Sequence, residues 1–444
     1  MDAFADKLGA LGAWAGQNKY LSAIKNSFQD FMPATIAGAI GVLWSNVIVN
    51  DGVVNGNPQG LGGIVPAVMA LEPYTNPVFN ALSFCTISCI AIGIAMLVAK
   101  EICYANGETG NYPFVLGFLM WLMVTPTSFV LGEGLGPDGA DITFSGISSS
   151  YTGATGLFTA LIVGILGAEL YCWLRKKDGL KIKMPDQVPP GVARAFEILI
   201  PGLITLLIVG FIGHFLHLAT GMYVNDAIST YIQAPLQQII GANIIAIMFM
   251  YLLIMAFWLV GIHGNNMLSA VKESIFKPML YANTEAYTAN KEIPNVFNLV
   301  MLQMFGEFGG SGITLGLVIA IFILGKRPDN KAIASLSIVP GLFNINETVT
   351  FGIPMVLNPI LGVPFLIAPC ITITVGYILT LIGFCPKVVL EVPWTMPPVL
   401  FGFLATGANI MGAISQLIVI VLSVVIYAPF VIAYENFQNK QAAE

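Results

Sequence analysis

Long apolar stretches recur along this chain, and each is close to the length of about 20 residues that a helix needs to cross a lipid bilayer. Inside a bilayer every backbone N–H and C=O group must be satisfied within the protein, so stretches of this kind fold as helices. Their order indicates a chain that crosses the membrane repeatedly. The clearest stretches cover roughly residues 31–50, 77–99, 113–131, 153–174, 198–220, 243–262, 360–384 and 407–434.

The composition excludes the usual soluble classes. Hydrophobic residues make up 56% of the chain and charged residues only 9%, whereas a soluble domain carries about 25% charged residues. Disorder would need low hydrophobicity and high charge. The Lys and Arg residues are spread along the whole chain, so we expect no nucleic-acid partner. We therefore predict an all-α integral membrane protein with about ten transmembrane helices, re-entrant hairpins and interfacial amphipathic helices.

The loops between the first apolar stretches differ in charge. Residues 51–76, 132–152 and 221–242 contain no Lys or Arg, whereas the loop 175–197 carries a cluster of them. Positive charge marks the cytoplasmic side of a membrane, so we expect this basic loop and both chain termini to be cytoplasmic. Before the first stretch, apolar residues recur at helical spacing over Tyr20–Asp30, which predicts an interfacial amphipathic helix.

The second half of the chain is irregular. The run 296–325 is broken by Gly306–Gly312, the run 332–358 by Asn344–Glu347, and the run 385–401 by several prolines. Interrupted helices of this kind hold the substrate in many transporters. We therefore predict a scaffold domain over 1–220, with the amphipathic helix and five transmembrane helices, and a substrate domain over 221–444.

Lysines on both sides of the first broken run constrain its path. Lys272, Lys277 and Lys291 precede residue 296, and Lys326, Arg327 and Lys331 follow residue 325. If both clusters are cytoplasmic, the chain between them crosses the membrane an even number of times or not at all. A re-entrant hairpin or a pair of short helices satisfies this condition.

Ionisable side chains inside apolar segments are costly and usually functional. Glu347 lies beside Asn344 and Asn346, a set of donors and acceptors that suits a ligand with many hydroxyl groups; the alternative is a hydrogen-bonded lock that ties a hairpin together. His263 lies at the end of an apolar stretch beside glycines and Asn265, where it either meets a ligand or bonds a helix end. Glu307, in the Gly-rich break, is either a ligand contact or part of a turn.

Two tryptophans complete the set of candidate substrate-binding residues. Trp258 precedes His263 by five residues, and Trp394 lies in the Pro-rich break. An aromatic ring packs well on the apolar face of a sugar, although each tryptophan could equally be a core or interfacial residue. The chain carries no G-x-x-x-x-G-K-[ST] motif, so we expect no ATP hydrolysis. We also expect no metal site and no cofactor.

At Gly261–Gly264 and Asn344–Glu347 the chain resembles a known family, the membrane component IIC of bacterial sugar phosphotransferase systems, in its lactose, cellobiose and N,N'-diacetylchitobiose group. The resemblance extends over nearly the full length and includes the basic loop and the broken second half. It implies a homodimer in the bacterial inner membrane that binds a β-linked disaccharide, carries it inward and presents it for phosphorylation.

The resemblance also implies partners and residue roles. The phosphoryl group would come from a phosphocysteine on a separate IIB protein, with IIA upstream, so the chain would be the membrane component of a protein-phosphohistidine–sugar phosphotransferase. Glu347 would bind the accepting hydroxyl and act as general base, and His263 would orient it or stabilise charge. Asn265, Asn344 and Asn346 would bind other hydroxyls. The basic charges of 175–197 and of Lys326–Lys331 would dock IIB or anionic lipid.

Two other functions remain open from the residues. In an ion-coupled secondary sugar transporter, Glu347 and His263 would relay a proton. In a scaffold or channel, neither residue would bind a specific ligand. The sequence does not distinguish cellobiose, chitobiose and lactose, because a few contacts decide between them.

Overall fold

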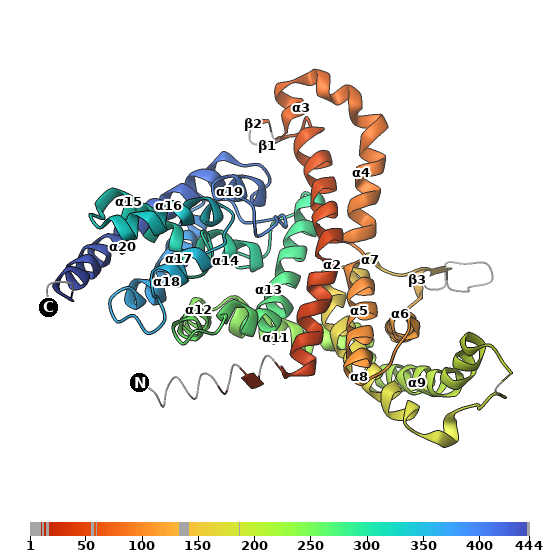
Figure 1. The fold of residues 1–444 in the computed structure, drawn as a ribbon. Coiled ribbons are helices and arrows are strands. Elements are labelled where there is room, and N and C mark those ends of the chain that lie inside the picture. The colour runs from red at the N-terminus through yellow and green to blue at the C-terminus, as the bar shows by residue number, and fades with distance from the viewer. Residues whose placement is uncertain are drawn as a thin grey trace. The chain divides into compact units, whose positions relative to one another are not determined.

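The computed structural model describes residues 10, 13–14, 17–54, 57–58, 60–132, 142–185 and 187–441, and these residues are mostly helical (Figure 1). The strands among them form two short antiparallel hairpins: β1 (Val53–Val54) pairs with β2 (Asn57–Pro58), and β3 (Ser128–Gly132) pairs with β4 (Ile142–Ser145). The predicted cytoplasmic position of the termini falls on 1–9 and 442–444, outside the described residues.

The described helices agree with a chain that crosses a membrane many times. By length and composition, seven of them could span a bilayer, or up to eight if a bent pair counts as one span. That pair, Val224–Gly241 and Ile244–Leu259, bends by 76° at its break. The predicted class, a helical multi-pass membrane protein, is confirmed, whereas the predicted number of about ten spans stays a prediction.

The chain divides into two compact units. Unit 2 comprises residues 18–35 and 84–236, and unit 1 comprises 1–17, 36–83 and 237–444. The predicted division into functional domains near residue 220 stays a prediction. Two helices run from one unit into the other: α2 (Lys19–Leu43) and α4 (Glu72–Thr86). The helices within unit 2 are α5 (Ile90–Ala105), α6 (Tyr112–Met123), α7 (Ser149–Thr152), α8 (Leu157–Arg175), α9 (Pro190–Thr220), α10 (Val224–Ile228) and α11 (Ala234–Leu236).

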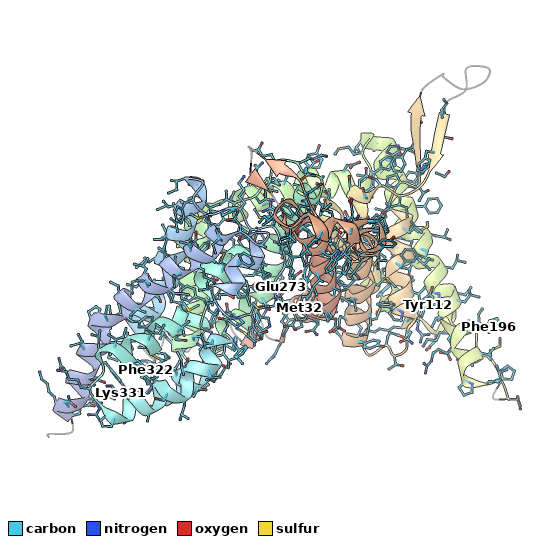
Figure 2. All side chains as sticks on the ribbon, turned by 90° about the horizontal axis from the view of Figure 1, so that it is seen from above. Met32, Tyr112, Phe196, Glu273, Phe322 and Lys331 are labelled. Atoms are coloured by element: carbon cyan, nitrogen blue, oxygen red, sulfur yellow. The ribbon has the colours of Figure 1, made fainter. Side chains whose placement is uncertain are left out.

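Unit 2 is built around α5, which packs against α6 and α8. One face of α5 is wholly buried and rich in alanine, including Ala91, Ala95 and Ala99. Small side chains let helices approach closely, the usual packing of helices in membranes. Large apolar side chains cover the outer side of α9, among them Phe196, which Figure 2 labels. A lipid-facing helix needs such a surface.

Three N-terminal predictions are corrected. The expected amphipathic helix at Tyr20–Asp30 and the expected span 31–50 fall in one candidate span, Lys19–Ile48, whose first part, α2, tolerates Pro33 in its interior. The stretch 77–99 lies within a longer candidate span, Pro66–Ala105, in which a turn at residues 87–89 separates α4 from α5. The stretch 113–131 is helical only to Met123, because the segment at Thr125-Pro126 ends α6 and leads into β3.

Unit 1 holds the broken helices. Its short segments α14 and α17 contain eight and six residues, so at 1.5 Å per residue neither approaches the roughly 30 Å of a bilayer core. Both predicted breaks, at Gly306–Gly312 and at Asn344–Glu347, are confirmed. The helices of unit 1 are α3 (Leu61–Ile64), α12 (Ile244–Leu259), α13 (Gly264–Thr288), α14 (Leu299–Gly306), α15 (Thr314–Leu324), α16 (Pro328–Leu342), α17 (Glu347–Gly352), α18 (Gly362–Leu381), α19 (Leu400–Ala405) and α20 (Ile410–Gln441).

Candidate functional site

A tight corner between α12 and α13 places His263. A Cβ atom added to Gly264 would lie 1.9 Å from the carbonyl oxygen of Ile254, so only glycine fits there. His263 precedes α13, and its Nδ1 accepts a hydrogen bond from the backbone N–H of Asn266 at 3.3 Å. When this imidazole is neutral, its proton therefore resides on Nε2. His263 can then offer an N–H donor to a ligand.

Trp258 supports His263 rather than facing outward. The two rings lie 4.5 Å apart between centroids, at an interplanar angle of 47°. Trp258 is only 4% exposed, and its Nε1 has no hydrogen-bond partner. In this conformation Trp258 reaches the site through its tilted ring contact with His263.

The Gly-rich turn between α14 and α15 lies against the turn between α16 and α17. Gly310 has a φ of 88°, and a Cβ atom there would lie 2.6 Å from the Cβ of Asn346. Asn346 is buried, and its Nδ2 donates to the carbonyl oxygen of Ser311 at 2.9 Å. Two breaks that are distant in sequence are thus fastened to each other.

Asn344 joins a third segment to this pair. Its backbone is left-handed, with a φ of 62°. Its Oδ1 accepts from the N–H of Gly309 at 2.7 Å, and its Nδ2 donates to the carbonyl oxygens of Trp394 and Met396. The Gly-rich turn, the α16–α17 turn and the Pro-rich segment therefore meet at one amide.

Glu347 is the first residue of α17, and its side chain is exposed. Its charge acts on the imidazole of His263, as do those of Glu307 and Lys272. The chain that follows α17 returns to the end of α12, where Leu357 N–H donates to the carbonyl oxygen of Leu259 at 2.9 Å. This main-chain hydrogen bond links the segment that follows α17 to the end of α12, four residues before His263.

The Pro-rich segment presents Trp394, which is 47% exposed. Gln416 of α20 holds the end of this segment, because its Oε1 accepts from the backbone N–H groups of Val399 and Gly402 at 2.7 and 2.8 Å. Its Nε2 donates to the carbonyl oxygen of Met304 at 3.0 Å. The sequence analysis missed Gln416, since a single glutamine in a long apolar helix carries no recognisable motif.

Glu307 ends α14 and belongs to a buried ion pair. Its Oε1 accepts from the hydroxyl of Tyr251 at 2.8 Å and contacts the ammonium group of Lys272. Lys272 also donates to Oδ1 of Asn265 at 3.2 Å, and Nδ2 of Asn265 donates to Oγ of Ser311 at 3.0 Å. Glu307 and Asn265 are thereby linked to the Gly-rich turn. Lys272 and Tyr251 are further residues of this network that the sequence analysis missed.

The position of Lys272 and Lys277 on the cytoplasmic side stays a prediction, but neither lysine lies in an exposed loop. Both are buried on α13, at 5% and 4% exposure. Lys277 pairs with Glu273, labelled in Figure 2, at 3.4 Å and with Glu391 at 3.7 Å. Because each lysine is paired with carboxylates inside the protein, neither reports which side of the membrane its segment faces.

Comparison with known proteins identifies the family. The sequence pattern of the phosphotransferase system EIIC family matches residues 25–369. The chain belongs to the phosphotransferase system EIIC family. The resemblance found in its two short motifs is thereby confirmed.

Relatives of this EIIC protein align over nearly its whole length. It is 30% identical to the "PTS system cellobiose-specific EIIC component" of Lactococcus lactis subsp. lactis (strain IL1403), over 97% of both chains. It is 30% identical to the "PTS system oligo-beta-mannoside-specific EIIC component" of Bacillus subtilis (strain 168), over 96% of this chain and 92% of the relative. Among solved structures, it is similar to the transporter ChbC, described as the IIC component from the N,N'-diacetylchitobiose-specific phosphotransferase system, with a TM-score of 0.87, 28% identity and 97% of both chains covered.

Proposed function

We propose that this EIIC protein binds a β-linked disaccharide of the cellobiose or diacetylchitobiose type, carries it inward and presents it to phosphorylated IIB. Family membership supports the general role in phosphotransferase sugar transport. The names of the cellobiose-specific and oligo-beta-mannoside-specific relatives, and of ChbC, support the sugar class. No observation favours the ion-coupled transporter that the sequence left open.

The observation that carries the site is the meeting of three broken segments at Asn344, three residues before the exposed carboxylate of Glu347. Glu347 is exposed and acts electrostatically on His263, while Asn344 ties the same turn to the exposed Trp394. A sugar bound here would meet a carboxylate acceptor, an imidazole donor and an aromatic face. Four further polar residues would shape this site: Asn265, Asn344, Asn346 and Glu307. They would bind the sugar with the donors and acceptors that are not used in contacts within the protein. Trp258 would support the site through its contact with His263.

The chemistry assigned to the site is transfer of a phosphoryl group to a sugar hydroxyl. The hydroxyl oxygen attacks phosphorus, the bond between phosphorus and the IIB cysteine sulfur breaks, and the sulfur leaves as a thiolate. Glu347 accepts the hydroxyl proton as general base. His263 donates its Nε2–H to an oxygen that gains negative charge. Phosphoryl transfer requires mainly positioning and charge stabilisation, so a few polar groups suffice.

The remaining architecture belongs to the same proposal. About ten crossings result if short helices such as α6 complete passages that length alone does not count. The outward apolar face of α9 supports either lipid contact or a homodimer. We place the protein in the bacterial inner membrane with both termini and the basic loop 175–197 cytoplasmic, because the segments 51–76 and 221–242 lack Lys and Arg. The product cannot return readily, since its phosphate carries about two negative charges.

The test is uptake by proteoliposomes that contain the purified protein. Cellobiose or diacetylchitobiose outside, with phosphorylated IIB inside, should yield internal sugar phosphate. Omitting IIB should abolish accumulation even when a pH gradient is imposed. Accumulation of unmodified sugar driven by the gradient alone would contradict the proposal and restore the ion-coupled alternative.

A further inference from the structure

We propose that Lys272 is a positioning residue of the sugar site, which sets the orientation of the Asn265 amide and, through it, the placement of the turn that carries Glu347. The inference rests on the proposed function, because it assigns a role within that same site. Its starting point is a buried lysine that the mechanism does not use. The ammonium group of Lys272 contacts Glu307 and Asn265.

Chemistry fixes the orientation of Asn265. A lysine ammonium group only donates hydrogen bonds, so Asn265 must turn its oxygen, Oδ1, toward Lys272. The amide nitrogen, Nδ2, is thereby directed at Oγ of Ser311, 3.0 Å away. Without the lysine, nothing in this set of contacts prevents the amide from turning over and presenting its oxygen to the serine.

The contacts continue to Glu347. Ser311 lies in the Gly-rich turn, and its carbonyl oxygen accepts from Nδ2 of Asn346 at 2.9 Å. Asn346 immediately precedes Glu347, and its own carbonyl oxygen accepts from the N–H of Thr350 in the first turn of α17. A shift of Asn265 is therefore passed through two hydrogen-bonded residues to the start of α17.

Lys272 also balances charge near His263. The ammonium group, Glu307 and Glu347 all act on the imidazole. Because Lys272 is buried, water screens its charge only weakly. Its removal would leave Glu307 with the hydroxyl of Tyr251 and without a cation, which destabilises a carboxylate that is largely shielded from water.

A second lysine on the same helix supplies the matched control. Lys277 lies five residues further along α13, is equally buried and pairs with Glu273 and Glu391, which are not among the predicted site residues. Lys277→Met therefore removes a buried cation from the same helix without touching Asn265. If Lys272 mattered only for the stability of α13, both substitutions would have the same effect on sugar binding.

The experiment is a double-mutant cycle on sugar affinity. Calorimetry with the full-length protein in detergent measures the Kd of cellobiose and diacetylchitobiose for wild type, Lys272→Met, Asn265→Ala and the double variant, with Tm recorded for each. We expect Lys272→Met to weaken binding about tenfold or more. The Kd of the double variant should lie within about twofold of the higher of the two single-variant Kd values. The reason is that both substitutions break the same chain of contacts. Lys277→Met should lower Tm and leave Kd within about twofold.

If Lys272→Met does not fold, the same cycle is measured with Glu307→Gln in every member, so that no unpaired carboxylate remains. Three results would each overturn the inference and leave the proposed function standing. They are an unchanged Kd in Lys272→Met, a loss of affinity in the double variant that equals the product of the two single losses, and a loss of affinity in Lys277→Met as large as that in Lys272→Met. A wild-type protein that binds neither sugar would overturn the proposed function, and the inference with it.

Discussion

The regular bundle of unit 2 and the broken helices of unit 1 satisfy the hydrogen bonds of their backbone groups in different ways. In α5, an uninterrupted helix pairs its own backbone groups, and alanines with larger apolar side chains form the buried face. Around α14 and α17 the helices stop inside the protein, and side chains such as Asn344, Asn346 and Gln416 satisfy the freed backbone groups. Irregular backbone at membrane depth is tolerated where protein supplies such partners.

The difference teaches where sensitivity to mutation should lie. In the bundle, a large-to-small substitution should lower stability in proportion to the side-chain volume that it removes. In the broken region, one side-chain amide forms hydrogen bonds with several backbone groups. Removing it should therefore lower stability and also displace the site. The following predictions test this contrast.

The largest expected effect is on chemistry. Glu347→Gln should lower the rate of sugar phosphorylation by phosphorylated IIB about 10²- to 10⁴-fold, the range of general-base catalysis. Because Glu347 is exposed, Tm should change by no more than a few degrees. The matched bundle variant is Glu101→Gln, which alters a carboxylate bonded to Asn26 and should leave the rate unchanged. A Glu347→Gln variant that retains full activity would remove the proposed base.

The next largest effect is on stability in the broken region. Gln416→Leu removes three hydrogen bonds to main-chain groups and leaves some of these groups buried without partners, so it should lower the free energy of unfolding by about 3 kcal/mol. In the bundle, Ile94→Val should cost only about 1 kcal/mol. Unfolding curves in detergent measure both. Equal costs would contradict the contrast between the two regions.

A glycine comparison sharpens the same point. Gly264→Ala forces a methyl group against the carbonyl oxygen of Ile254 and should destabilise the protein by about 2 kcal/mol while weakening sugar binding, since His263 is the neighbouring residue. Gly341→Ala meets no atom closer than 3.8 Å and should change stability by less than about 1 kcal/mol. Tm and Kd measured on both variants provide the check, and a Gly264→Ala protein indistinguishable from wild type would refute the tight corner.

The smallest effect concerns a peripheral ion pair of unit 2. Lys19 and Glu169 lie 2.5 Å apart, but both side chains remain partly exposed. Lys19→Ala should therefore cost only about 0.5 kcal/mol, and less at high salt. A loss as large as that of Gln416→Leu would show that charge, rather than packing, holds the bundle together.

The sequence predicted the membrane class and both central breaks because these depend on local signals. Apolar length marks a span, and clustered glycines or asparagines mark where a helix must stop. The same local signals predicted the α16–α17 turn with Glu347 and the α12–α13 corner with His263.

Tertiary contacts that local patterns do not encode account for the rest. The amphipathic helix at Tyr20–Asp30 was expected to be separate from the span that begins at residue 31, yet α2 continues across residues 30 and 31. Lys272 and Lys277 follow the pattern of loop charges, but their partners Glu307 and Glu391 lie far along the chain. Asn344 and Asn346 were predicted as direct ligands of hydroxyl groups, and the structure gives their amide nitrogens internal acceptors from other segments. Such pairings require the folded chain.

The central claim is that a carboxylate and an imidazole from separate segments of unit 1 act on one bound sugar. An experimental structure with cellobiose or diacetylchitobiose bound tests it most directly. The account predicts density for the sugar against Trp394, with Glu347 and His263 each within about 3.2 Å of a sugar oxygen. Sugar density at another place, or a bound sugar that neither side chain reaches, would contradict it.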